Sequence, residues 1–189
     1  GKTAAEVFSS EICMAFIQQD QLVMSGQPLS QHLELHLYQS GLLGWCVATK
    51  IPLKNGQGEV LGMAGMAVDL QEDRLNRPNI NSKLSKVEQY ISEKFDTPIQ
   101  ITELANIAGL SVSQLNRQFQ NIFHLTPSQL IQKKRLDCAI ELLAQDISVT
   151  EVSVRCGYAE HSAFGRKFKE LTSVSPRQFK QQLLKLKQE

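Results

Sequence analysis

Residues 104–119 read LANIAGLSVSQLNRQF, and a related segment, VSVRCGYAEHSAFGRKF, follows at residues 152–168. The pattern Leu-x-Arg-x-Phe that begins at Leu115 returns as Phe-x-Arg-x-Phe in the second stretch. Gly109 and Gly157 are 48 residues apart, whereas Arg117 and Arg166 of the two patterns are 49 residues apart. The second copy therefore has one extra residue between its glycine and its pattern. The sequence therefore predicts that one structural unit occurs twice.

Each copy has the pattern of a helix, a tight turn and a second helix. Apolar residues recur at helical spacing before Gly109, and glycine permits the positive φ that such a turn needs. Small Ala105 lets the two helices cross closely, and Ser111 is a suitable cap for the second helix. Two helix-turn-helix units are expected, at about residues 100–123 and 149–171.

A joining helix is predicted between the two units, over about residues 127–145. Pro127 stands at its start, and apolar residues follow at helical spacing. A helix in this place would hold two recognition helices at a fixed separation, so that they enter successive major grooves of B-DNA, about 34 Å apart, without a dimer. A scaffold of repeated helical hairpins is less expected, because solenoids usually have three or more copies.

Residues 83–187 resemble the DNA-binding domain of the AraC/XylS transcription regulators. The family pattern appears as LANIAGLSVSQLNRQF, TPSQLIQKKRLDCAIELL, VTEVSVRCGYAEHSAFGRKFKE and SPRQF. The resemblance implies an all-α, homeodomain-like double helix-turn-helix domain that binds double-stranded DNA in a bacterial transcription regulator, with RNA polymerase as a partner. His124 and Ser173 stand where the family most often has Gly, so strained chain reversals are expected at both positions.

Carried over position by position, the resemblance places two sets of residues on the base-facing sides of the recognition helices. The first set is Ser113, Gln114, Asn116 and Arg117, and the second set is His161, Ser162, Gly165 and Arg166. Arginine can pair with guanine, and Asn or Gln with adenine, whereas glycine offers no side chain, so the first set is expected to read bases in more detail. Local ion pairs for the two arginines and helix capping for His161 are the competing interpretations.

Four lysines are expected to contact phosphates, namely Lys133, Lys134, Lys167 and Lys169. Arg135 is expected instead to serve packing within the domain, as the family pattern Arg-Leu often does at this place. Residues 83–189 carry fifteen Lys and Arg against eleven Asp and Glu, whereas residues 1–82 carry five against eight. The basic excess thus lies with the predicted DNA-binding helices.

The N-terminal third has a different periodicity. Apolar and polar residues alternate around Leu33–Leu37 and Trp45–Ile51, which predicts strands, and a third strand is expected over residues 60–70 after a hairpin turn at 54–58. Helices are expected before them, over Ala4–Phe8 and Ser10–Ser25. An antiparallel sheet with helices follows, and the chain as a whole is expected to be α+β.

The segments GKTAAEVF, QDQLVMSGQPL and GEVLGMAGMAVDL resemble the later half of a PAS sensor domain. The resemblance implies a partial PAS-like sensor at residues 1–71, a linker at 72–82 and the DNA-binding domain at 83–189. The chain begins with Gly and lacks the earlier PAS strands, so the natural sensor is expected to start further upstream. No cofactor motif is visible, which leaves a small-molecule effector as the expectation for this domain, and its open sheet edge could form a homodimer.

His32, Glu34 and His36 project from one side of a predicted strand. A metal site is one interpretation, but a solvent-facing polar stripe opposite three leucines is favoured, and no metal is expected. The four cysteines have no paired spacing and are expected to be reduced, mostly buried thiols of a cytoplasmic protein: Cys13, Cys46, Cys138 and Cys156. No apolar run approaches the roughly 20 residues of a membrane helix.

The expected function is therefore a sequence-specific DNA-binding transcription factor that responds to a signal through a PAS-like domain. One alternative is a PAS-type partner-binding or dimerisation module. Another is a metal or thiol enzyme that uses His32, His36 or Cys46, with the helices as an accessory domain. An enzyme is disfavoured, because no acid, base and nucleophile converge in the sequence.

Overall fold

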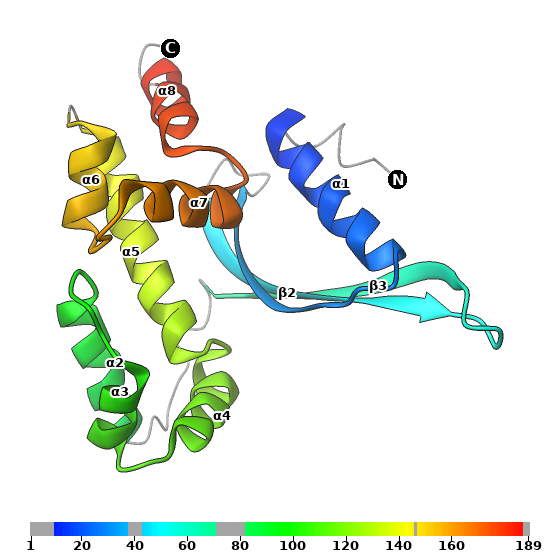
Figure 1. Ribbon diagram of the computed structural model, residues 1–189, viewed down its shortest axis with the longest axis horizontal. Helices are drawn as coiled ribbons and strands as arrows, with labels where there is room; N and C mark the ends of the chain where they lie inside the picture. The colour runs from blue at the N-terminus through cyan, green and yellow to red at the C-terminus, as the bar shows by residue number, and fades with distance from the viewer. Residues whose placement is uncertain (1–9, 38–42, 71–81, 146, 187–189) are drawn as a thin grey trace. The chain divides into compact units, whose positions relative to one another are not determined.

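The computed structural model describes residues 10–37, 43–70, 82–145 and 147–186 (Figure 1). The chain divides into two compact units, one built mainly from residues before 76 and the other mainly from residues after 75. The first unit combines one helix with a sheet, and the second is helical, so the expected α+β class is confirmed.

The N-terminal unit is a helix on a three-stranded antiparallel sheet. Its elements are α1 (Ser10–Met24), β1 (Leu29–Leu37), β2 (Leu43–Lys54) and β3 (Val60–Asp69). The strand order is β1-β2-β3, and Val47 lies opposite both Leu33 and Val68. Asn55 Oδ1 closes the β2–β3 hairpin by accepting hydrogen bonds from two backbone N–H groups. The predicted strands and hairpin are confirmed, whereas the helix expected at Ala4–Phe8 lies outside the described residues.

The prediction that Glu34 belongs to a solvent-facing polar stripe on β1 is wrong, because Glu34 is only 5% exposed. The reason is that α1 covers this face of the sheet. Gln19 Nε2 of α1 donates to Glu34 Oε2 over 3.1 Å, and Cys46 Sγ lies 3.7 Å from Glu34 Oε1. On the same face Lys50 Nζ of β2 pairs with Asp20 of α1 at 2.7 Å. A buried carboxylate needs such donors, because an unpaired charge is costly in a core.

The two histidines beside Glu34 give no support to a metal site. His32 is half-buried, and the side chain of His36 lies outside the described residues. In the described part of the chain, no three His, Cys, Asp or Glu side chains gather in a way that could hold a metal ion. Nor does any described helix have the length and apolar character needed to cross a membrane.

Seven described helices form the C-terminal unit. They are α2 (Ser82–Lys94), α3 (Ile101–Ala108), α4 (Val112–Phe123), α5 (Pro127–Leu143), α6 (Val149–Arg155), α7 (His161–Thr172) and α8 (Pro176–Leu186). Their fully buried side chains include Leu84, Ile91, Leu104, Leu115, Phe119, Leu136, Leu143, Val152, Phe164 and Phe168. These are the residues that recur at helical spacing, so both copies bury their apolar stripes.

The duplication extends to the helix that follows each unit. Thr126 Oγ1 accepts the N–H of Gln129 and Gln129 Oε1 accepts the N–H of Thr126, which is a capping box at the start of α5. Ser175 and Gln178 exchange the same two bonds at the start of α8. Because a capping box satisfies two otherwise orphan donors, it fixes where each helix begins.

Candidate DNA-binding interface

The two turns share their hydrogen bonds but differ in length. In the first turn the N–H groups of Gly109 and Leu110 donate to the carbonyls of Asn106 and Ala105. In the second turn Gly157 and Tyr158 donate in the same way to Val154 and Ser153, and both glycines have positive φ, 64° and 76°. One residue separates Gly109 from the cap of α4, whereas two separate Gly157 from Glu160, before α7. The predicted extra residue is therefore confirmed, and it is Ala159.

Helix α4 buries its apolar side and presents polar side chains on the other. Leu115, Phe119 and Phe123 are buried. Of the first predicted base-reading set, Ser113, Gln114 and Arg117 are exposed and Asn116 is half-buried. The exposed residues lie on a helix whose opposite side is fixed in the core, which is the arrangement that a recognition helix requires.

Gln114 has a second role that limits what it can read. Its Oε1 accepts the N–H of Ser111 over 3.0 Å, while its own N–H donates to Ser111 Oγ over 3.2 Å. Bidentate recognition of adenine needs both the amide oxygen and the amide nitrogen of a glutamine. Gln114 would have to open the capping box to make that contact, whereas no capping bond engages Asn116 or Arg117 in the described part of the chain.

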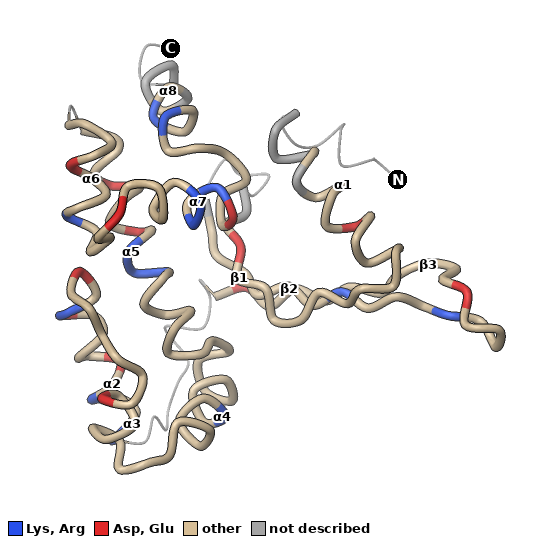
Figure 2. The backbone as a smooth tube through the Cα atoms, in the orientation of Figure 1, with Lys and Arg blue, Asp and Glu red and all other residues tan. Residues whose placement is uncertain are grey.

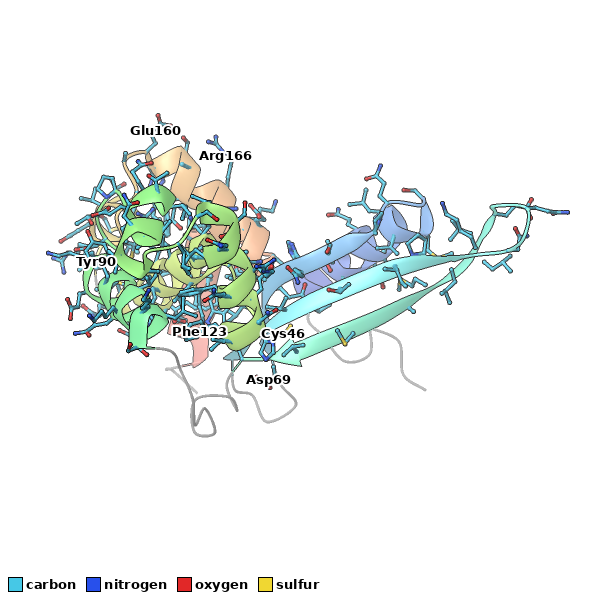
Figure 3. All side chains as sticks on the ribbon, turned by 90° about the horizontal axis from the view of Figure 1, so that it is seen from below. Cys46, Asp69, Tyr90, Phe123, Glu160 and Arg166 are labelled. Carbon is cyan, nitrogen blue, oxygen red and sulfur yellow. The ribbon has the colours of Figure 1, made fainter. Side chains whose placement is uncertain are left out.

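Helix α7 also has a buried apolar side and an exposed polar side. Phe164 and Phe168 are buried, His161, Ser162 and Arg166 are exposed, and Gly165 is half-buried. A Cβ on Gly165 would meet no atom of the described residues within 4 Å, so packing among them does not require glycine there. Figure 3 shows Arg166 projecting from the outer edge of the C-terminal unit.

Arg135 on α5 connects the segment between α2 and α3 with the second helix-turn-helix unit. Its Nε donates to the carbonyl of Phe95 over 2.7 Å and its Nη2 to that of Thr97 over 2.9 Å, both in the segment between α2 and α3. Its guanidinium carbon lies 5.3 Å from the ring centre of Tyr158, in the second turn. Tyr158 in turn donates to Gln132 Oε1 on α5 over 3.0 Å. The expectation that Arg135 serves packing is confirmed.

The four lysines expected to bind phosphates have different surroundings. Lys133 pairs with Asp137 at 2.7 Å, and only 16% of its side chain is exposed. Lys134 and Lys167 are half-buried and Lys169 is exposed. Figure 2 shows basic positions in α5 and in α7. Lys169 is thus the most accessible of the four, while a phosphate contact by Lys133 would compete with its carboxylate partner.

The described cysteines are reduced, and burial dominates their chemistry. Cys46 and Cys156 are buried and Cys138 is half-buried; Cys13 lies where side chains are not described. Burial and the neighbouring Glu34 carboxylate raise the pKa of Cys46 to about 12. Burial also raises the pKa of Cys156 and of Cys138, and the two thiols influence each other's pKa, which their spacing in the sequence did not indicate. A thiol with a raised pKa is the opposite of a catalytic nucleophile.

Comparisons with known proteins agree with this geometry. Residues 104–182 match a family model described as a helix-turn-helix domain, and residues 1–75 match one described as a PAS fold. The chain is 31% identical over 94 residues to a probable transcriptional regulator, LumQ, from Photobacterium leiognathi, covering 49% of this chain and 38% of that protein. It is 33% identical over 100 residues to the HTH-type transcriptional regulator GbdR of Pseudomonas aeruginosa, covering 52% and 27%. The matches thus span well under half the length of these relatives.

Solved structures share the fold of the C-terminal unit. The C-terminal domain of AraT, a response regulator from Geobacillus stearothermophilus, is similar with a TM-score of 0.52 and 24% identity, over 55% of this chain and 88% of that one. The DNA-binding domain of AdpA, a global transcriptional factor solved in complex with a target DNA, gives a TM-score of 0.54 and 24% identity, over 58% and 99%. At these identities the likeness concerns the fold.

Proposed function

Because the chain belongs to the AraC-type helix-turn-helix family of transcriptional regulators and carries a PAS-fold segment, we propose that it is a sequence-specific DNA-binding transcription factor. In this proposal α4 and α7 enter successive major grooves on one face of double-stranded DNA. The N-terminal unit, up to about residue 71, receives the signal, and residues 72–82 connect it to the reader.

One observation carries the proposal: two helices with the same buried apolar pattern present polar side chains, and α5 joins them. Figure 1 shows α4 beside the start of α5 and α6 beside its other end. The contacts of Arg135 link the segment that leads into the first helix-turn-helix unit with the turn of the second. A link of this kind makes the spacing of the two recognition helices a property of the folded chain, which suits a reader that works as a monomer.

Within the interface we assign separate roles. Arg117, Asn116 and Ser113 read bases in one block of the operator, and Arg166, Ser162 and His161 read the other block. Gly165 allows α7 to approach the DNA closely. Lys134, Lys167 and Lys169 contact phosphates, with Lys133 in a minor part because of its pair with Asp137.

A second copy of this chain and RNA polymerase are the protein partners that we propose. β3 borders the sheet of the described N-terminal unit, and its exposed apolar side chains include Leu61 at 72% and Met66 at 66%. Exposed apolar residues on an edge strand favour pairing with another chain. Sedimentation of the wild type and of Met66→Glu tests the pairing of two copies of this chain. The variant should remain monomeric at concentrations where the wild type dimerises.

The proposed function is tested by selecting binding sites for the purified chain from a random DNA library at moderate salt. The expected result is a site of two short blocks separated by about one helical turn. Arg117→Ala should cost about 1–3 kcal/mol of binding free energy and relax the preference at one base pair of one block, and Arg166→Ala should do the same in the other. Arg155→Ala is the matched control, since Arg155 is an exposed arginine paired with Glu151 on α6. No enrichment at all would refute the proposal.

A further inference from the structure

We propose that Glu160 determines specificity in the DNA block read by α7 by accepting a hydrogen bond from an amino-bearing base, with cytosine preferred. This inference rests on the proposed function above. Glu160 lies outside the two predicted base-reading sets; aligning the two copies places it before α7, and its contacts in the structure point to a role in DNA recognition.

Glu160 takes the place in the second unit that Ser111 takes in the first. The carbonyl of Ser111 accepts the N–H of Leu115 over 2.9 Å, and the carbonyl of Glu160 accepts the N–H groups of Ala163 and Phe164 over 3.1 and 3.2 Å. Both residues therefore stand immediately before a recognition helix. The N-terminal residues of a recognition helix are the ones that reach base edges in helix-turn-helix proteins.

The side chain of Glu160 is available for such a contact. Glu160 is exposed, and Ser162 Oγ donates to its Oε2 over 3.4 Å. In the described part of the chain no Lys or Arg forms an ion pair with it. Figure 3 shows Glu160 and Arg166 projecting at the same outer edge of the C-terminal unit. The carboxylate therefore lies at the same edge as Arg166, within reach of the Ser162 hydroxyl.

An ionised carboxylate only accepts hydrogen bonds, so the base opposite it must donate one. In the major groove cytosine offers the N4 amino group, and adenine offers N6 beside the N7 acceptor. Guanine and thymine present oxygen acceptors at the corresponding place, which would repel Glu160. Phosphates also repel the carboxylate. When the base opposite Glu160 cannot donate a hydrogen bond, nothing offsets this repulsion. Glu160 therefore determines specificity chiefly by disfavouring guanine and thymine. This contribution matters in α7 because Gly165 supplies no side chain to read a base.

The test compares the wild type with Glu160→Ser and Glu160→Gln by site selection and by binding to single-base variants of the selected site. Glu160→Ser installs the residue that already caps α4, so the start of α7 is kept. The wild type should prefer cytosine over guanine and thymine at one base pair by roughly 5- to 150-fold, and Glu160→Ser should reduce this to less than about twofold. Glu160→Gln should broaden the choice, since an amide also donates. Preferences in the α4 block should stay unchanged.

Two results would overturn the inference. If Glu160→Ser binds every sequence more tightly by one common factor, Glu160 only repels phosphates. If the base preferences of the wild type and of Glu160→Ser agree at every position, Glu160 reads nothing. In both cases the wild type still selects a two-block site, so the proposed function stands; a wild type that selects no DNA would refute both. Far-UV circular dichroism of each variant shows whether its helices are intact.

Discussion

The backbone of Asp96 fills the space beside Gly157 that a side chain would need. A Cβ built on Gly157 would lie 2.7 Å from the Asp96 Cα and closer still to its carbonyl group. Gly109, the equivalent glycine of the first unit, has no such neighbour, because a Cβ there would meet only Lys83 Nζ, at 3.6 Å. The second turn is thus closed against the segment between α2 and α3, whereas the first is open.

Gly157→Ala should therefore destabilise the C-terminal unit far more than Gly109→Ala. Both variants place a Cβ at positive φ, which costs about 1–2 kcal/mol. Only Gly157→Ala also forces two backbone segments apart, at a further cost of about 1–3 kcal/mol by comparison with overpacked cores. Urea unfolding followed by far-UV circular dichroism measures both values. Equal losses in the two variants would contradict the closed turn.

Arg135→Lys should lower the stability of the C-terminal unit and weaken the protein's preference for one spacing between the two operator blocks. The lysine keeps the charge but cannot reach both carbonyls that Arg135 binds, and each hydrogen bond to a charged group contributes about 1.5–3 kcal/mol. Binding to sites with one base pair added or removed between the blocks should fall less steeply than in the wild type. Lys134→Met is the control, which should weaken binding at all spacings alike. An unchanged spacing preference in Arg135→Lys would mean that α5 alone sets the separation.

His124→Gly should stabilise the protein. His124 ends α4 with φ at 57°, and Ser173 ends α7 with φ at 69°, so both positions that depart from the family's glycine do adopt the left-handed conformation. Replacing a side chain there by glycine removes about 1 kcal/mol of strain. Thermal unfolding should show a higher midpoint for His124→Gly and a lower one for Ser162→Gly, which places glycine inside α7. A lower midpoint for His124→Gly would show that the contacts of its side chain outweigh the strain.

Ser153→Ala should also stabilise the C-terminal unit. Ser153 is 1% exposed, and its hydroxyl has no hydrogen-bond partner among the described residues, while the equivalent residue of the first unit is Ala105. An unsatisfied buried polar group costs about 1–3 kcal/mol. Chemical denaturation should show a gain of about 1 kcal/mol for Ser153→Ala and a loss of similar size for Ser111→Ala, which removes a helix cap. A loss in both variants would indicate a partner for Ser153 in solution.

The N-terminal unit should lose stability at alkaline pH. The pKa of Cys46 is about 12 in the folded chain, above the ordinary value of a thiol, so the folded state holds this proton more tightly than the unfolded state does. The contribution is complete below about pH 9 and is lost as pH rises towards 12, on the order of 1 kcal/mol per pH unit. Fluorescence of Trp45, the one tryptophan of the chain, reports this unit. Cys46→Ala should show a shallower decline, and parallel declines would exclude Cys46 as the cause.

Features encoded within a few residues were predictable from the sequence. The boundaries of α4 and α5 follow from Ser111, Thr126 and Pro127, because caps act on the next turn of chain. The capping role of Gln114 was predictable too, since Ser-x-x-Gln is the capping-box pattern. The position of Glu160 follows from aligning the two copies with one inserted residue. Each of these signals lies in one short segment or in its repeat.

Features that depend on distant segments could not be predicted in this way. The contact of Gly157 with Asp96 and the bonds of Arg135 to Phe95 join residues far apart in sequence, and no periodicity connects them. The burial of Glu34 has the same origin. Alternation in β1 shows that His32 and Glu34 share a face, but not that α1 covers it. Tertiary contacts decide such cases.

The double engagement of Gln114 has an evolutionary consequence. A mutation at this position changes both the start of α4 and the groups offered to DNA, so a new base preference arises there only together with a change in helix capping. Arg166 on α7 makes no comparable capping contact in the described part of the chain. Among descendants of this regulator, the operator block that faces α7 should therefore diversify sooner than the block that faces α4.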